Sequence, residues 1–183
     1  MRDVLTVDAL SLAKQPTIIG TNADEGVAFV PLQAGGRINE TEAAAATLAF
    51  FLCPAVESVA DRLAAGLPVY RYFYAGNFTN VSPQGFLGAY HESELPLLFG
   101  TDDEFRGPST PLEEETSRAM QDAWLAFASA GTEGMAEVGW PKFNFGTGEV
   151  REFGAAGVAV RDIQLRDEQA KCAPIIGVTA LVG

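Results

Sequence analysis

One segment near the middle of the chain restricts the fold more than any other. In the run Val69-Tyr70-Arg71-Tyr72-Phe73-Tyr74-Ala75, β-branched and aromatic residues occupy both alternating faces. Such a run predicts a β-strand that is covered on both sides, because a strand with one solvent-exposed face would alternate apolar and polar residues. Its backbone groups need partners on both edges, since buried N–H and C=O groups are otherwise left unpaired. We therefore expect this segment to lie inside a sheet.

The surrounding segments alternate between helix and strand patterns. Residues 16–20 predict a second short buried strand, because they are apolar and β-branched between a proline and a glycine. Capping residues, first-turn prolines and terminal glycines predict helices over 39–51, 54–66 and 110–131, and shorter extended pieces are expected over 140–143 and 150–153. Helices alternating with buried strands indicate the α/β class. Two buried strands cannot complete a doubly wound sheet, so we expect an incomplete sheet whose first strands lie elsewhere.

Composition excludes several kinds of partner and cofactor. The 183 residues suit one domain, and 12 basic against 24 acidic side chains give a net charge of −12, which repels nucleic acid and anionic lipid. The longest apolar run, 43–55, is far shorter than the ~20 residues of a membrane span, and residues 1–5 do not resemble a signal peptide. With one histidine and no Gly-rich phosphate loop, we expect neither a metal nor a cofactor.

Two cysteines and three glycosylation motifs bear on the compartment. Cys53 and Cys172 are compatible with two free thiols or with one disulfide. The motif N-x-S/T occurs at Asn39, Asn77 and Asn80. Three such motifs in a chain of this length favour a secreted glycoprotein.

His91 is the one histidine and the best candidate for a general base. It follows the strand at 69–75, and Glu25 follows the strand at 16–20 in the turn Asp24-Glu25-Gly26. If the two strands are parallel neighbours, both loops leave the same edge of the sheet, where function gathers in α/β folds. Glu25 would then reach His91, with Asp24 as the rival acid. The alternatives are a surface histidine and a solvated turn.

A triad also needs a nucleophile. The α/β-hydrolase order is serine, acid, histidine, with the serine in a G-x-S-x-G turn. No such motif occurs in the 183 residues, and Ser11 is the sole serine before Glu25.

Two segments resemble the type-B carboxylesterase/lipase family, which includes the cholinesterases. Gly20-Thr21-Asn22-Ala23-Asp24-Glu25-Gly26 is similar to the loop that carries the family's triad acid. Gly88-Ala89-Tyr90-His91-Glu92-Ser93-Glu94-Leu95-Pro96-Leu97-Leu98-Phe99-Gly100 is similar to its histidine segment. The resemblance extends over about residues 16–172. It implies that residues 1–183 are the C-terminal part of a single α/β-hydrolase domain.

The resemblance also assigns roles to individual residues. It implies that Glu25 is the triad acid and His91 the base, with Glu94 in a buried polar network behind them. It implies a disulfide between Cys53 and Cys172, which agrees with secretion. The implied activity is hydrolysis of a small-molecule or lipid ester through an acyl-enzyme on a serine.

The chain departs from the family pattern in one respect that bears on activity. The serine turn and the oxyanion-hole glycines are not among its residues, so we expect a fragment that is inactive alone. Two alternatives stay open: a non-catalytic, cholinesterase-like interaction module, or an unproductive truncated gene product.

Overall fold

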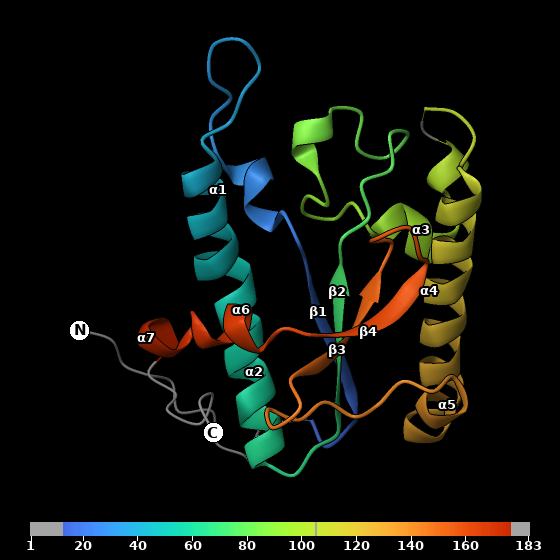
Figure 1. Ribbon diagram of the computed structural model, residues 1–183. Coiled ribbons are helices and arrows are strands. Elements are labelled where there is room, and N and C mark those ends of the chain that lie inside the picture. The colour runs from blue at the N-terminus through green and yellow to red at the C-terminus, as the bar shows by residue number, and fades with distance from the viewer. Residues whose placement is uncertain (1–12, 105, 177–183) are drawn as a thin grey trace.

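A four-stranded sheet forms the centre of the molecule (Figure 1). The computed structural model describes residues 13–104 and 106–176, so Ser11 lies outside the described residues. The sheet order is β1-β2-β3-β4, with β1 at Thr17–Asn22, β2 at Val69–Tyr74, β3 at Glu149–Phe153 and β4 at Val160–Gln164. β1, β2 and β3 run parallel, and β4 pairs antiparallel with β3.

The two expected buried strands are thus parallel neighbours. Their register aligns Thr17 with Val69 and Asn22 with Tyr74, so both strands end at the same level. Among the described residues, β1 pairs with β2 only, and its other edge is open. This is the incomplete α/β sheet that the sequence predicts.

Helices cover both faces of the sheet (Figure 1). One face carries a continuous helical run made of α1 (Glu40–Ala46), the π-helical segment η2 (Thr47–Leu52) and α2 (Cys53–Ala64). The other face carries α4 (Pro111–Ala130), followed by α5 (Thr132–Glu137).

Short helical elements make up most of the connections. They are η1 (Glu25–Phe29), η3 (Gly85–Leu87), α3 (Leu95–Phe99), η4 (Asp102–Glu104), α6 (Arg166–Ala170) and α7 (Ala173–Ile176).

Alternation along β2 divides the core into two layers. Val69 and Phe73 pack with Val59 of α2 and Val150 of β3. Tyr70, Tyr72 and Tyr74 belong to the cluster on the other face, which includes Met120 and Ala123 of α4. Both faces of β2 are therefore covered, as its composition predicts.

The run from α1 to α2 differs from the two separate helices expected. Pro54 was expected to open a new helix, but the helix continues from Glu40 to Ala64 over 25 residues. Proline has no N–H to donate to the preceding turn, and the six residues before α2 form π-helical turns there. By length and composition alone, this run is long and apolar enough to cross a membrane. The expectation that the longest apolar stretch, 43–55, is too short for a membrane span is therefore revised. Val56 and Val59 of this run are buried against the rest of the fold, and 28% of its apolar window is buried overall.

Two more expectations differ from the structure in detail. Residues 140–143 form no strand; Phe143 instead donates its N–H to the carbonyl oxygen of Val69 (2.8 Å). The hairpin strand β4 was not expected, because most of its residues are exposed and its sequence lacks an apolar alternation.

Cys53 and Cys172 form a disulfide between α2 and the segment joining α6 to α7. Their Cα atoms lie 5.1 Å apart, the residues are 119 positions apart, and both side chains are fully buried. The cross-link therefore joins two distant parts of the chain beneath the surface.

We predict that the double variant Cys53→Ala/Cys172→Ala is less stable by roughly 4 kcal/mol, because the cross-link removes a large loop entropy from the unfolded chain. Guanidinium unfolding followed by circular dichroism measures this. Leu125→Ala, at an exposed position of α4, is the matched control and should unfold like the wild type. Equal midpoints for the double variant and the wild type would contradict the prediction.

Candidate active site

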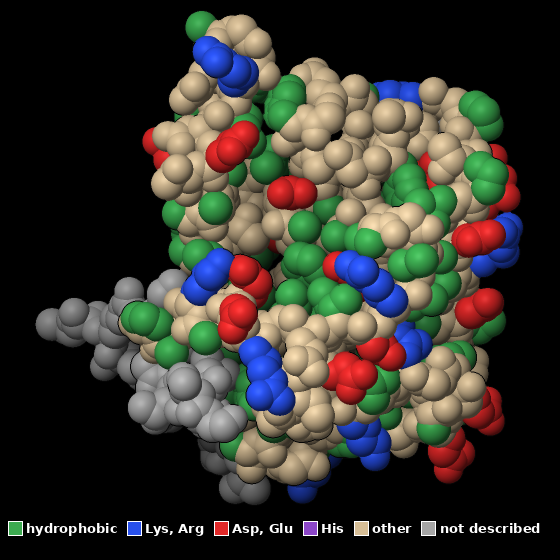
Figure 2. All heavy atoms as spheres, viewed as in Figure 1, with side chains coloured by type: hydrophobic (Ala, Val, Ile, Leu, Met, Phe, Trp, Pro, Cys, Tyr) green, Lys and Arg blue, Asp and Glu red, His purple; other side chains and the backbone are tan. Residues whose placement is uncertain are grey.

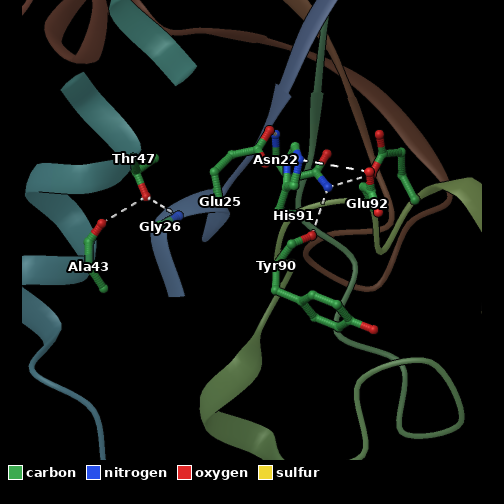
Figure 3. A network of polar contacts seen from close by, with 9 residues as sticks. Asn22, Glu25, Gly26, Ala43, Thr47, Tyr90, His91 and Glu92 are labelled. Carbon is green, nitrogen blue, oxygen red and sulfur yellow. Dashed lines mark hydrogen bonds and ion pairs between the residues drawn. The ribbon is translucent and has the colours of Figure 1, made fainter. Parts of the chain in front are cut away.

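The segments that follow β1 and β2 stay together beyond the sheet. Asp24 and Tyr90 form a further parallel bridge, in which Asp24 N–H donates to the carbonyl oxygen of Ala89 (3.0 Å). The Asp24 carboxylate accepts the Ala89 N–H (2.9 Å). This double contact places the next residues of the two segments, Glu25 and His91, side by side (Figure 3).

Glu25 and His91 are in direct contact. The Nδ1 atom of His91 lies 2.6 Å from Oε2 of Glu25, and Glu25 is 6% exposed. The second carboxylate oxygen of Glu25 accepts the N–H of Asn22 (2.8 Å). Both oxygens of the acid are thus held, and Glu25 is not a solvated turn residue. The rival acid Asp24 instead binds the backbone of the histidine segment.

The other side of the imidazole is more open. The His91 side chain is 36% exposed, and its Nε2 lies 3.9 Å from a carboxylate oxygen of Glu92, which is itself exposed. Aromatic rings flank the imidazole: the centroids of Phe51 and Phe29 lie 4.7 and 5.4 Å away. A base with one nitrogen on a buried acid and the other free is suited to accept a proton at Nε2.

Gly26 allows the acid segment to approach the helical run closely. A Cβ at this position would lie 2.1 Å from the carbonyl oxygen of Ala43. The Gly26 N–H donates to Oγ1 of Thr47 (2.9 Å), and that hydroxyl donates to Ala43 (3.0 Å). The glycine after the acid is therefore required by this packing, which fixes η1 against α1 and η2 (Figure 3).

Asn22, the last residue of β1, links the acid segment to the histidine segment. Its side-chain amide donates to the carbonyl oxygen of Tyr90 (2.9 Å) and to Oε2 of Glu94. Glu94 thus lies in a polar network behind the pair. Burial raises the pKa of Glu94, the hydrogen bond from Asn22 opposes that shift, and the nearby Glu25 adds to it. Sequence reasoning missed Asn22; its one signal was its position as the last residue of a buried strand.

Glu92 has a strained backbone. Its φ is 69°, in the left-handed region that residues with a side chain rarely adopt. The strained residue directly follows the candidate base, where such strain is often found.

The three glycosylation motifs differ in accessibility. Asn77 is exposed, and Asn39 caps α1 by accepting the N–H groups of Thr41 and Glu42. Asn80 is 7% exposed, and its amide nitrogen, where a glycan would be attached, donates to Asp102. The folded chain does not present Asn80. Within the described ranges, no three His, Cys, Asp or Glu side chains gather as a metal site would require.

The raised pKa of Glu94 predicts a pH-dependent stability. A carboxyl whose pKa is higher in the folded than in the unfolded state binds protons more readily when folded, so stability falls as pH rises through that interval. We expect Glu94→Gln to have a larger free energy of unfolding than the wild type near pH 7, and the gain to vanish near pH 4. Urea unfolding at both values measures this, with the exposed Glu57→Gln as control. A variant that is less stable than the wild type near pH 7, with a smaller loss near pH 4, would mean that the charged form stabilises the fold and would contradict the prediction.

Comparisons with known proteins identify the family of the chain. The model of the carboxylesterase family matches residues 33–172, a narrower span than the 16–172 expected, and one that includes His91 but not Glu25. Secreted lipase 5 of Gibberella zeae is 43% identical over 137 residues, covering 71% of this chain and 25% of the lipase. The chlorogenic acid esterase of Aspergillus niger is 41% identical over 126 residues, covering 61% and 25%.

A solved structure of a PNB esterase has the same fold. It superimposes with a TM-score of 0.61 at 21% identity, over 85% of this chain and 37% of that one. The chain spans about a quarter of the length of the curated relatives it matches. Since the family model covers most of the chain, and the fold is that of the α/β-hydrolases, the chain belongs to the carboxylesterase family.

Proposed function

We propose that this chain supplies the base and the acid of a serine-type carboxylic ester hydrolase, with His91 as the base and Glu25 as the acid. The observation that carries the proposal is the 2.6 Å contact between His91 Nδ1 and a buried Glu25 carboxylate, while Nε2 is free of hydrogen bonds to the described residues. A carboxylate in this position fixes the imidazole tautomer and stabilises the imidazolium that forms during acyl transfer.

The reaction then follows from the free nitrogen. His91 Nε2 takes the proton of a serine hydroxyl as its oxygen attacks the ester carbonyl, and Glu25 stabilises the resulting imidazolium. The imidazolium gives that proton to the leaving alcohol, and an acyl-enzyme remains. In the second half, His91 takes a proton from water as it attacks the acyl-enzyme, and returns it to the serine as the acid departs.

The nucleophile in this proposal lies outside the 183 residues. The G-x-S-x-G turn does not occur in the sequence, and the chain corresponds to about a quarter of its relatives' length. The open edge of β1 supports the same idea, because a buried strand needs a partner there. Alone, the chain would hold a base and an acid with nothing to activate.

The substrate we propose is a small-molecule or lipid ester. Two relatives are named a lipase and a chlorogenic acid esterase. Phe29 and Phe51, which flank the imidazole, favour an apolar or aromatic group beside the reacting ester. We propose no cofactor or metal for this chemistry, since the base, acid and serine suffice.

We further propose that the protein is secreted. The buried Cys53–Cys172 disulfide is stable in an oxidising compartment, and one relative is named a secreted lipase. Asn77 and Asn39 would be the glycosylated positions.

The first test uses the 183-residue chain alone. We expect it to hydrolyse p-nitrophenyl butyrate no faster than its His91→Ala variant, since neither has a nucleophile for the base to activate. Initial rates at 400 nm measure this. A wild-type rate clearly above that of His91→Ala would place a nucleophile within these residues and overturn the division of the triad.

A chimaera tests whether the pair can act as proposed. The matching part of the Gibberella zeae lipase is replaced by residues 16–172 of this chain, and folding is checked by circular dichroism. We expect a folded, active chimaera in which His91→Ala lowers kcat/KM roughly a thousand-fold or more, while the exposed Glu57→Gln leaves it unchanged. A folded, active chimaera that tolerates His91→Ala would refute the role of His91.

A further inference from the structure

A cavity of about 600 Å³ lies on the sheet face that carries the helical run. Its volume is within the range of roughly 300–1,000 Å³ that small-molecule sites occupy. Figure 2 shows the corresponding hollow between the helical run and the β3–β4 hairpin, with apolar side chains inside it and charged ones at its rim. The lining comes from β1, β2, η2, β4 and α6, so elements from the whole chain enclose it.

The cavity adjoins the candidate active site but does not include its base or acid: Asn22 and Asp24 line it, whereas Glu25 and His91 do not. Leu48 and Leu52 of η2 line it, whereas Phe51 of the same segment packs against His91. His91 is not among the lining residues, and no histidine is visible on the face in Figure 2. A ligand here would not touch the base, and none of the roles proposed above uses this space.

The interior is largely apolar and contains two buried polar atoms without a hydrogen-bond partner among the described residues, the Thr21 hydroxyl and Asn22 Oδ1. Its apolar lining includes Val27, Leu48, Leu52, Phe73, Ile163 and Leu165. Thr21 also lines it and is 4% exposed, yet its Oγ1 has no hydrogen-bond partner among the described residues. A buried hydroxyl without a partner is unfavourable, so this position calls for a ligand group that can hydrogen-bond.

The charges of the lining select against anions. Four carboxylates, those of Asp24, Glu40, Glu152 and Glu168, face a single lysine, Lys171, which is already paired with Glu168 (2.7 Å). Glu152 is paired with Arg161. The remaining charge is therefore negative, which repels a carboxylate, and burying any free charge among these apolar side chains is costly.

We propose that this cavity binds an uncharged medium-chain alcohol, with its alkyl chain in the apolar interior and its hydroxyl hydrogen-bonded to Thr21 Oγ1. An alcohol is one of the two products of ester hydrolysis, and the lining charges distinguish it from the other, the carboxylic acid. That the bound alcohol is a reaction product rests on the proposed function. The binding of an alcohol in the cavity does not, so a binding assay tests the binding separately.

Calorimetric titration of the 183-residue chain with 1-octanol, and with octanoate at pH 7, tests the proposal. We expect one octanol per chain and binding of octanoate at least ten-fold weaker. Thr21→Val should weaken octanol binding about two- to ten-fold, the range of one net hydrogen bond. Because that hydroxyl has no partner within the protein, the melting temperature should not fall. A variant that melts lower but binds octanol normally would show that Thr21 serves the fold instead.

Leu48→Trp, which fills the cavity, should abolish octanol binding, and Leu125→Trp, at an exposed position of α4, should leave it unchanged. Circular dichroism checks that each variant is folded; if Leu48→Trp is not, Thr21→Val and the comparison with octanoate decide. No octanol binding to the folded wild type, equal binding of octanoate, or full binding to a folded Leu48→Trp would overturn the proposal.

Discussion

The parallel pairing of β1 with β2 is the constraint on which the candidate site depends. In-register pairing ends both strands at one level, and the Asp24–Tyr90 bridge carries the pairing past the sheet. Residues 66 positions apart in the chain, Glu25 and His91, are thereby brought to 2.6 Å. The helical run between the strands supplies the crossover and also presses on the acid segment at Gly26, so one connection both sets the strand order and fixes the acid.

Around this pairing the molecule buries several carboxylates, and each is held in a different way. Glu25 accepts hydrogen bonds from the backbone N–H of Asn22 and from the histidine, whereas Glu94 accepts one from the side-chain amide of Asn22 and has a raised pKa. Glu113, fully buried, closes the capping box at the start of α4. Burying a charge without such partners is costly, and Arg71, which is 1% exposed, lacks them among the described residues. The hydroxyls of Thr21, Tyr74 and Ser93 are buried without a partner among the described residues, and of these three only Thr21 lines the cavity, which is why it points to a ligand.

The sequence predicted the features that local patterns control. Apolar, β-branched runs indicated β1 and β2, the Thr110–Glu113 box indicated α4, and loop position after parallel strands indicated Glu25 and His91. Features that depend on packing could not be predicted from the sequence. These are the π-helical turns before Pro54, the role of Asn22, the burial of Asn80 and the exposed strand β4. Each of these depends on contacts between segments far apart in the chain, which no window of sequence reports.

We infer that Glu25 holds His91 with its proton on Nδ1 and with Nε2 unprotonated. Because the chain has one histidine, ¹⁵N NMR of the labelled imidazole reads this without ambiguity. At a pH where the ring is neutral, we expect the Nδ1–H tautomer in the wild type and in Glu92→Ala, and loss of that preference in Glu25→Ala. An Nε2–H tautomer in the wild type, or the same tautomer mixture with and without Glu25, would contradict it.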